Sequence, residues 1–210
     1  MSPLLLPSVV PAPVGAAPAP TAAGLRPLVI GLDVALGTTG VAGVGWTERI
    51  TTGTRRDENR LTYLLGMVRS YYRAADFVAI EGPAFARATQ RGHDELAAIR
   101  WMIRCDLHRR GTPFAVVPPN NRIKYVLGTT RPRVSPGGRF LSPAECKGAV
   151  RDAAATWFGV EFEGPARYDR ADAYVLLAMG LHHLGHPLAD LPTTHTRALD
   201  GVAWPERTDQ

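Results

Sequence analysis

The feature that most constrains this chain is a pair of short apolar runs, each ending in one carboxylate. Residues 28 to 33 read Leu-Val-Ile-Gly-Leu-Asp, and residues 77 to 81 read Phe-Val-Ala-Ile-Glu. Runs this apolar are typical of strands buried on both faces of a sheet. A carboxylate at the end of such a strand is costly to desolvate and needs a partner or a metal. Because ligands bind at this end of the strands in open α/β sheets, we interpret Asp33 and Glu81 as the first sign of a metal-dependent site.

Length and charge limit the classes of protein that fit. The chain has 210 residues, and we expect one domain over residues 26 to 186. We predict a disordered Pro/Ala-rich tail over residues 1 to 25 and an irregular C-terminal tail over residues 187 to 210. The net charge of +5 favours a polyanionic partner. Two cysteines outside any CxxC pair indicate a reduced, cytoplasmic setting, and no apolar stretch is long enough to span a membrane.

Hydrophobic periodicity predicts a meander of strands that is followed by alternating helices and strands. A turn at residues 37 to 40 leads to strands at 41–46 and 48–53, and another strand lies at 114–117. Helices are expected at 57–75 with Asp57 as cap, 92–110, 119–128, 143–158 after a capping box at Ser142, and 169–184. This order predicts an α/β fold with a mixed sheet flanked by helices.

A third acidic element opens the last of these helices. Asp169 and Asp172 are three residues apart, which places them on one helix face, and we expect both in the first turn. The apolar residues that follow indicate that this helix packs on the sheet, so its acids can reach the strand ends. Four converging carboxylates suit two Mg²⁺ ions, which cleave phosphodiesters when held ~3.5–4 Å apart. The alternative is that Asp169 caps its helix while Asp172 pairs with an arginine.

These motifs, taken in order, carry a resemblance to a known family. They are Gly31-Leu32-Asp33, Thr39-Gly40-Val41, Ala79-Ile80-Glu81, Asn121-Arg122-Ile123-Lys124, Ser142-Pro143-Ala144-Glu145-Cys146-Lys147 and Asp169-x-x-Asp172. The chain resembles the RuvC-like Holliday-junction resolvases of the ribonuclease H-like superfamily over about residues 26 to 184. The resemblance implies a ribonuclease H-like five-stranded mixed sheet, and a homodimeric nuclease of DNA recombination and repair.

The same resemblance implies roles for individual residues. Asp33, Glu81, Asp169 and Asp172 would be the catalytic acids that bind two Mg²⁺, with Mn²⁺ able to substitute. Lys124 and Lys147, the only lysines in the chain, would lie near the scissile phosphates. Phe85 resembles the aromatic residue that stacks on a base at the junction centre, with packing as its alternative. Cleavage of four-way or other branched DNA would leave 5′-phosphates.

The chain also departs from the family pattern. The turn after Asp33 lacks the usual Asp-Pro-Gly, and the loop from Gly128 to Ser142 is longer than in typical cellular members. With these differences the chain resembles a bacteriophage-type or otherwise divergent member of the family. The loop carries arginines among glycines and prolines, which suits a flexible segment that contacts the phosphates of DNA. The alternative is an insertion that is simply solvated. The expected DNA-binding residues are Phe85, Arg122, Lys124, Arg131, Arg133, Arg139 and Lys147.

Other functions compete with this interpretation. A ribonuclease H-type enzyme that cuts RNA–DNA hybrids would use the same acids, and a non-catalytic nucleic-acid binder would keep only the fold. Residues 37 to 40 resemble the phosphate turn of actin-like ATPases, but those need two such domains, so we expect no nucleotide cofactor. The helix that contains Leu96, Ile99 and Ile103 is a candidate dimer interface, although such stripes more often pack in the core.

Overall fold

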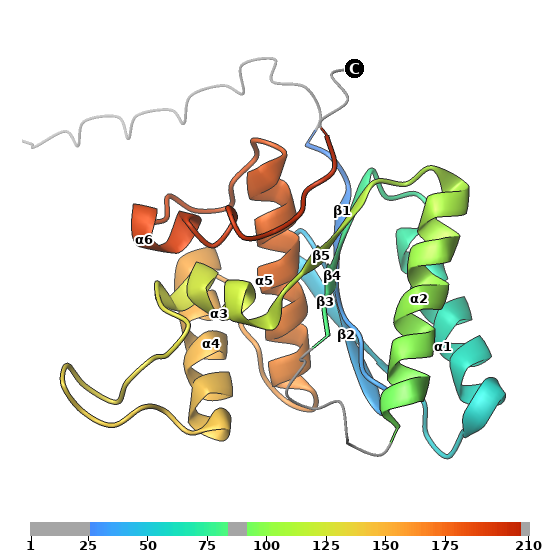
Figure 1. Cartoon of the computed structure of the whole chain (residues 1–210), viewed down its shortest axis with the longest axis horizontal. Coiled ribbons are helices and arrows are strands. Elements are labelled where there is room, and N and C mark those ends of the chain that lie inside the picture. Colours follow the sequence, from blue (N-terminus) through green and yellow to red (C-terminus); the bar gives the residue numbers. More distant parts are fainter. Residues whose placement is uncertain (1–25, 84–91, 207–210) are drawn as a thin grey trace, which may run out of the picture.

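The protein is a three-layer α/β domain, described here from a computed structural model. The structure describes residues 26 to 83 and 92 to 206. A central sheet separates α1 and α2 on one face from α5, α3, α4 and α6 on the other (Figure 1). The expected disordered tail over residues 1 to 25 lies outside the described residues, as do Phe85 and its neighbours.

The sheet has five strands in the order β3-β2-β1-β4-β5. β1 pairs antiparallel with β2, and β2 with β3, whereas β1, β4 and β5 run parallel. The predicted mixed five-stranded sheet is therefore confirmed. The strands are β1 Val29–Asp33, β2 Thr38–Gly43, β3 Trp46–Thr51, β4 Phe77–Glu81 and β5 Phe114–Val117.

The predicted position of the first turn is wrong, because β2 begins at Thr38 rather than at residue 41. The buried hydroxyl of Thr39 donates to the carbonyl of Ala35 and accepts from the amide of Ala35. The hydroxyl of Thr52 donates to the carbonyl of Leu36 at 2.7 Å. These bonds close the turn directly after Asp33 and draw residues 38 to 40 into the strand.

Two helices cover one face of the sheet, α1 Asp57–Tyr72 and α2 His93–Arg110. Asp57 does not cap α1 as predicted, because Arg56 is the N-cap and no side chain caps it. Ile99 and Ile103 of α2 are fully buried in the core that this layer forms with the sheet. The stripe that we considered as a dimer interface is therefore occupied within the chain, which is the commoner use of such a stripe.

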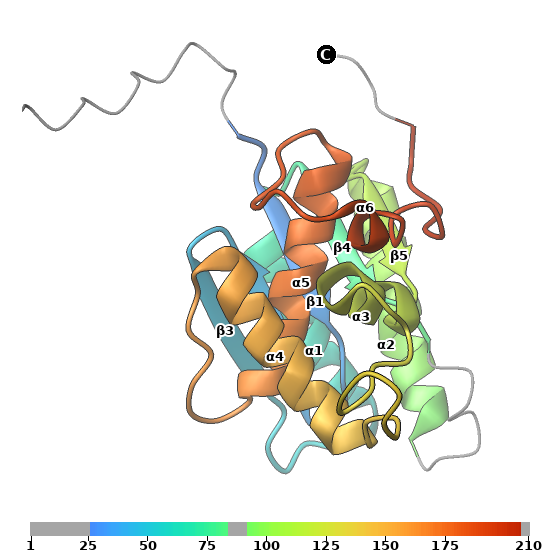
Figure 2. The ribbon, with the colours of Figure 1, turned by 90° about the vertical axis from the view of Figure 1, so that its left-hand side faces the viewer.

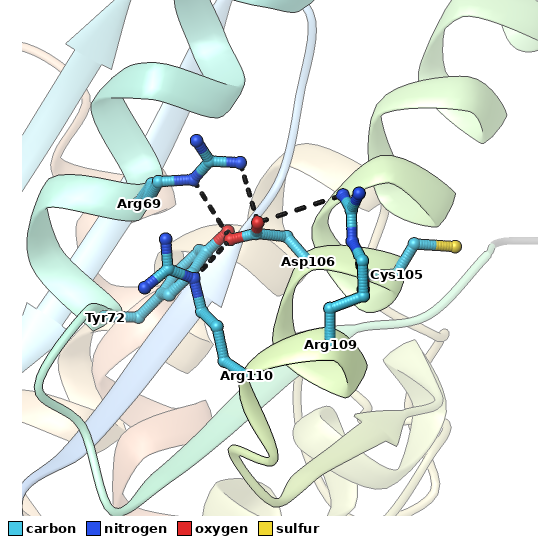
Figure 3. Close-up of polar contacts among 6 residues, drawn as sticks. All are labelled: Arg69, Tyr72, Cys105, Asp106, Arg109 and Arg110. Atoms are coloured by element: carbon cyan, nitrogen blue, oxygen red, sulfur yellow. Dashed lines mark hydrogen bonds and ion pairs between the residues drawn. The ribbon is translucent and has the colours of Figure 1, made fainter.

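A polar cluster ties α1 to α2 near their C-terminal ends (Figure 3). The buried carboxylate of Asp106 accepts two bonds from Arg69, at 2.6 and 3.1 Å. It also accepts from the hydroxyl of Tyr72 and from Nε of Arg110, each at 2.9 Å, while Arg109 lies 3.9 Å away. Both carboxylate oxygens of Asp106 have hydrogen-bond partners, which offsets the free-energy cost of burying the charge. The cluster therefore links α1 to α2.

The helix that organises the opposite face is α5 Arg167–His183. Its residues 171 to 181 are all buried, and it crosses β1, β2 and β4. Two glycines allow this close packing: a Cβ on Gly31 would lie 2.0 Å from the carbonyl oxygen of Ala173, and one on Gly40 2.0 Å from that of Asp169. The backbones of helix and sheet therefore touch directly at two points.

The remaining helices pack around α5. They are α3 Pro119–Leu127, α4 Pro143–Phe158 and α6 Thr193–Thr196, and α4 runs beside α5 (Figure 2). The predicted capping box at Ser142 and Glu145 is confirmed, with both reciprocal bonds present. The segment after His186 is not wholly irregular, since it forms α6 and buries Ala198 and Val202 in the core. No helix in the described ranges is long and apolar enough to cross a membrane.

Candidate active site

The sheet register brings the two strand-terminal acids together. Leu32 of β1 pairs in parallel with Ile80 of β4, so the next residues, Asp33 and Glu81, end neighbouring strands. Their carboxyl groups are close enough to shift each other's pKa. Asp33 is 7% exposed, so this pair of acids lies at the edge of the core, as the apolar runs predicted.

Helix α5 supplies the other two acids. Asp169 lies in its first turn, whereas Asp172 lies one turn further in and is 3% exposed. The prediction that both occupy the first turn is wrong because the helix begins two residues earlier, at Arg167. Asp169 does not cap the helix either, since the N-cap is Ala166.

All four acids line a single pocket of about 430 Å³ at the C-terminal ends of β1 and β4. The cationic side chains of Arg100, Arg122 and Lys147 also line it, together with the imidazole of His93. The predicted convergence of Asp33, Glu81, Asp169 and Asp172 is thus present in the structure. A pocket in which carboxylates and cations face one another is suited to binding a cation and a phosphate together.

Arg122 is the most tightly held cation in this pocket. It lies near the start of α3, and its side chain is 9% exposed. Nε donates to Oε1 of Glu81 at 3.0 Å, and Nη2 forms an ion pair with the same oxygen at 2.9 Å. Nη1 donates to Oδ1 of Asp172. Asp172 therefore does pair with an arginine, as the alternative reading of the sequence expected. That arginine is, however, itself part of the acidic pocket.

Burial and charge shift the pKa values of the acids in different directions. Burial raises the pKa of Asp33 well above its usual value, and the charges of Glu81 and Asp172 add to this rise. Burial also raises the pKa of Asp172 to about 6, although Arg122 opposes the shift. Burial alone would raise the pKa of Glu81, but Arg122 and the hydrogen bond from Asp33 lower it. Glu81 is therefore the acid that holds its negative charge most firmly.

Asp169 and Lys147 form the more open side of the pocket. Burial raises the pKa of Asp169, and the nearby charge of Lys147 opposes this rise. Lys147 lies in the first half of α4, whose start the capping box defines. Lys147 thus lines the same pocket as the acids, and its expected place near the scissile phosphates stays a prediction.

The other predicted lysine does not reach the pocket. Lys124 lies on α3 two residues after Arg122 and is half-buried, but it does not line the pocket. Residues two apart on a helix point in different directions, so only one of them can face the acids. Arg122, which was expected only to bind DNA, takes this place.

Sequence reasoning missed Arg100 of α2. It lines the pocket, its charge interacts with those of Glu81 and Asp33, and burial lowers its pKa. A signal was present, because Arg100 lies between Leu96 and Ile103 on the apolar side of its helix. A charge in such a stripe indicates a buried partner.

The arginines of the long loop lie on a hairpin. Arg133 and Phe140 form an antiparallel bridge, and the guanidinium of Arg133 lies 3.8 Å from the centre of the Phe140 ring, with that of Arg131 at 4.5 Å. Arg139 binds Glu145 at 2.6 and 2.8 Å. None of the three arginines lines the acidic pocket. Phe85 lies outside the described residues.

The donor set suits a hard divalent cation, because carboxylate oxygens are the ligands that Mg²⁺ prefers. Within residues 26–83 and 92–206, however, no three acidic, histidine or cysteine side chains are placed to hold a metal ion as they stand. In this arrangement Arg122 bonds two of the acids at once. The residues therefore fit the metal by the chemistry of their oxygens, while Glu81 and Asp172 are bonded to Arg122.

The sheet order and the helices that flank the sheet match the ribonuclease H-like fold of RuvC. The structure is similar to that of Thermus thermophilus RuvC, with a TM-score of 0.56 and 15% identity, over 76% of this chain and 97% of that one. It is also similar to T. thermophilus RuvC in complex with a Holliday junction substrate, with a TM-score of 0.54 and 16% identity over the same shares. No protein-family model matches the sequence, and no curated protein matches it.

Proposed function

We propose that this protein is a metal-dependent endonuclease that resolves four-way DNA junctions, or other branched DNA, by paired symmetrical nicks. The observation that carries the proposal is the convergence of four carboxylates from β1, β4 and α5 on one pocket. The fold that holds this pocket is shared with a RuvC whose structure contains a Holliday junction substrate. The basic balance of the chain, with 24 Lys and Arg against 19 Asp and Glu, suits a polyanionic substrate.

The proposed roles follow from the lining of the pocket. Asp33, Glu81, Asp169 and Asp172 would hold two Mg²⁺, with Mn²⁺ as a substitute. When bound, such ions supply an activated water and stabilise the leaving oxygen of a phosphodiester. Lys147 would balance the charge of Asp169 and contact a phosphate oxygen. Because nicking a junction at symmetrical positions needs two active sites, we propose a homodimer, with 5′-phosphate ends as products.

The first test is cleavage of labelled DNA substrates in Mg²⁺ by wild type, Asp33→Asn and Asp152→Asn. The panel holds a four-way junction, a three-way fork, an RNA–DNA hybrid and a linear duplex. Asp33→Asn should lose more than about 100-fold in rate while it still binds the junction, since even an outer partner of a metal ligand contributes roughly 10–100-fold. Asp152 is exposed and outside the pocket, so Asp152→Asn should cut like wild type.

The substrates separate the proposal from its rivals. Paired nicks in the junction support a resolvase. Cleavage of the hybrid alone would instead assign a ribonuclease H-type activity. Binding without cleavage in either Mg²⁺ or Mn²⁺ would contradict the enzyme and leave a nucleic-acid binder.

A further inference from the structure

One residue of the acidic pocket links its two walls. Arg122 bonds Glu81 on the strand side and Asp172 on the helix side, through different nitrogens of the same guanidinium. Arg122, Glu81 and Asp172 are each at most 13% exposed at the side chain. The guanidinium is thus a cation held between two carboxylates in a site that little water reaches.

Electrostatics explains why a cation is needed at this position. Glu81 and Asp172 come from different elements, and Asp33 adjoins Glu81, so the pocket gathers like charges that repel one another. A planar guanidinium can bond two carboxylates at once, which an ammonium group cannot do with the same geometry. Arg122 therefore holds together two walls that would otherwise be forced apart.

The oxygens that Arg122 occupies are also those that a divalent ion would use. Oε1 of Glu81 accepts a hydrogen bond from Nε of Arg122 and lies 2.9 Å from Nη2, and Oδ1 of Asp172 accepts a hydrogen bond from Nη1. A lone pair that binds a guanidinium proton cannot bind a metal ion at the same time. The neighbouring Arg100 has no hydrogen-bond partner at its buried Nε, so the pocket already holds a second cation that the acids do not fully engage.

We propose that Arg122 is the resident counter-ion of the metal-free site, and that its guanidinium and a divalent metal ion compete for Glu81 and Asp172. This inference rests on the proposed function, because it presumes that these acids bind a metal. It makes Arg122 a positioning residue that preserves the shape of the pocket and sets its metal affinity. Metal binding then releases the guanidinium within a pocket that receives a phosphate.

The test is calorimetric titration with Mn²⁺ alone, without DNA, on wild type, Arg122→Gln and Arg122→Lys. Arg122→Gln should bind Mn²⁺ about tenfold more tightly or better, since one charge within ~4–6 Å of a carboxyl shifts its equilibria by roughly 1–3 decades. Arg122→Lys should be intermediate. Metal-free Arg122→Gln should also melt at a lower temperature than wild type, and Mn²⁺ should raise its melting temperature by more.

The matched control is Arg69→Gln. Arg69 also binds a buried carboxylate through two nitrogens, in the Asp106 cluster, and it lies outside the acidic pocket. This substitution removes the same charge from the chain, so the Mn²⁺ affinity of the variant should equal that of wild type.

The outcomes separate this inference from the function on which it rests. Equal or weaker Mn²⁺ binding by Arg122→Gln overturns the competition, even if wild type cleaves junctions. If Arg122→Gln does not fold, Arg122→Lys decides in the same way, and equal or weaker binding overturns the inference. If neither wild type nor any variant binds Mn²⁺, the metal-dependent function and the inference both fall.

Discussion

At the scale of single residues, Asp172 shows opposing influences on one carboxyl group. It is buried, which favours its neutral form, and it is paired with Arg122, which favours its charged form. Burial is the larger influence, so it raises the pKa of Asp172 to about 6. The pKa of Asp33 is also raised, mainly by burial. A metal that binds here must therefore compete with protons for these two carboxyl groups.

This balance predicts how metal binding depends on pH. For an acid whose pKa is raised, the proton is present below the shifted pKa and absent above it. Mn²⁺ affinity should thus increase as the pH rises through about 6, and the raised pKa of Asp33 adds to this increase. The affinity should be at least about tenfold weaker at pH 5 than at pH 7.5. Calorimetry in two buffers of different ionisation enthalpy would count the protons released. An affinity that is constant over this range would contradict the prediction.

At the scale of elements, the contact between α5 and the sheet depends on glycine. A Cβ at Gly40 would meet the carbonyl of Asp169 at 2.0 Å, and both atoms belong to backbone that cannot rotate away. Helix α5 would have to move at the end that carries Asp169 and Asp172. The spacing of the acids is thus coupled to a strand residue that takes no part in the chemistry.

We predict that Gly40→Ala lowers the free energy of unfolding by about 1–3 kcal/mol, the usual cost of overpacking a core. It should also weaken Mn²⁺ binding, because the acids of α5 shift relative to Asp33. Gly37→Ala is the matched control, since nothing lies within 4 Å of its added Cβ. Urea unfolding measures the first effect and calorimetry the second. If the two alanine variants are equally stable, the close approach of the two backbones is not what places α5.

The sequence predicted the helices and strands better than it predicted where they begin and how they pack against one another. The apolar runs of β1 and β4 and the capping box of α4 are local signals, and they led to correct elements. The register that places Asp33 beside Glu81, and the choice of Arg122 over Lys124, depend on how α3 docks against α5. No local pattern encodes that docking. The start of α5 at Arg167 was missed because no side chain caps it.

At the scale of the whole molecule, positive charge is spread unevenly. The acidic pocket lies in a chain of net charge +5, and the hairpin of residues 129 to 142 carries three arginines. Arg131 and Arg133 stack on Phe140 without an acidic partner among the described ion pairs, whereas Arg139 is engaged by Glu145. The first two are therefore better placed to neutralise phosphates.

This difference predicts the salt dependence of junction binding. Removing one arginine that neutralises a phosphate should reduce the slope of log affinity against log salt by ~0.9. The double variant Arg131→Gln/Arg133→Gln should therefore lower the slope by up to about 1.8, and Arg139→Gln by clearly less. Fluorescence anisotropy at several salt concentrations, with a labelled four-way junction, measures both. Equal slopes for wild type and the double variant would show that Arg131 and Arg133 do not neutralise phosphates.

The two glycines beneath α5 have a consequence for how such a site can change over time. Gly31 and Gly40 let the backbones of sheet and helix meet directly, so the separation of the strand acids from the helix acids depends on this close approach. Replacing an acid removes a carboxylate from the site, whereas replacing one of these glycines changes the distance between the carboxylates of the strands and those of the helix. A related chain with a larger residue at either position can therefore keep all four carboxylates and still lose the spacing that brings them into one pocket.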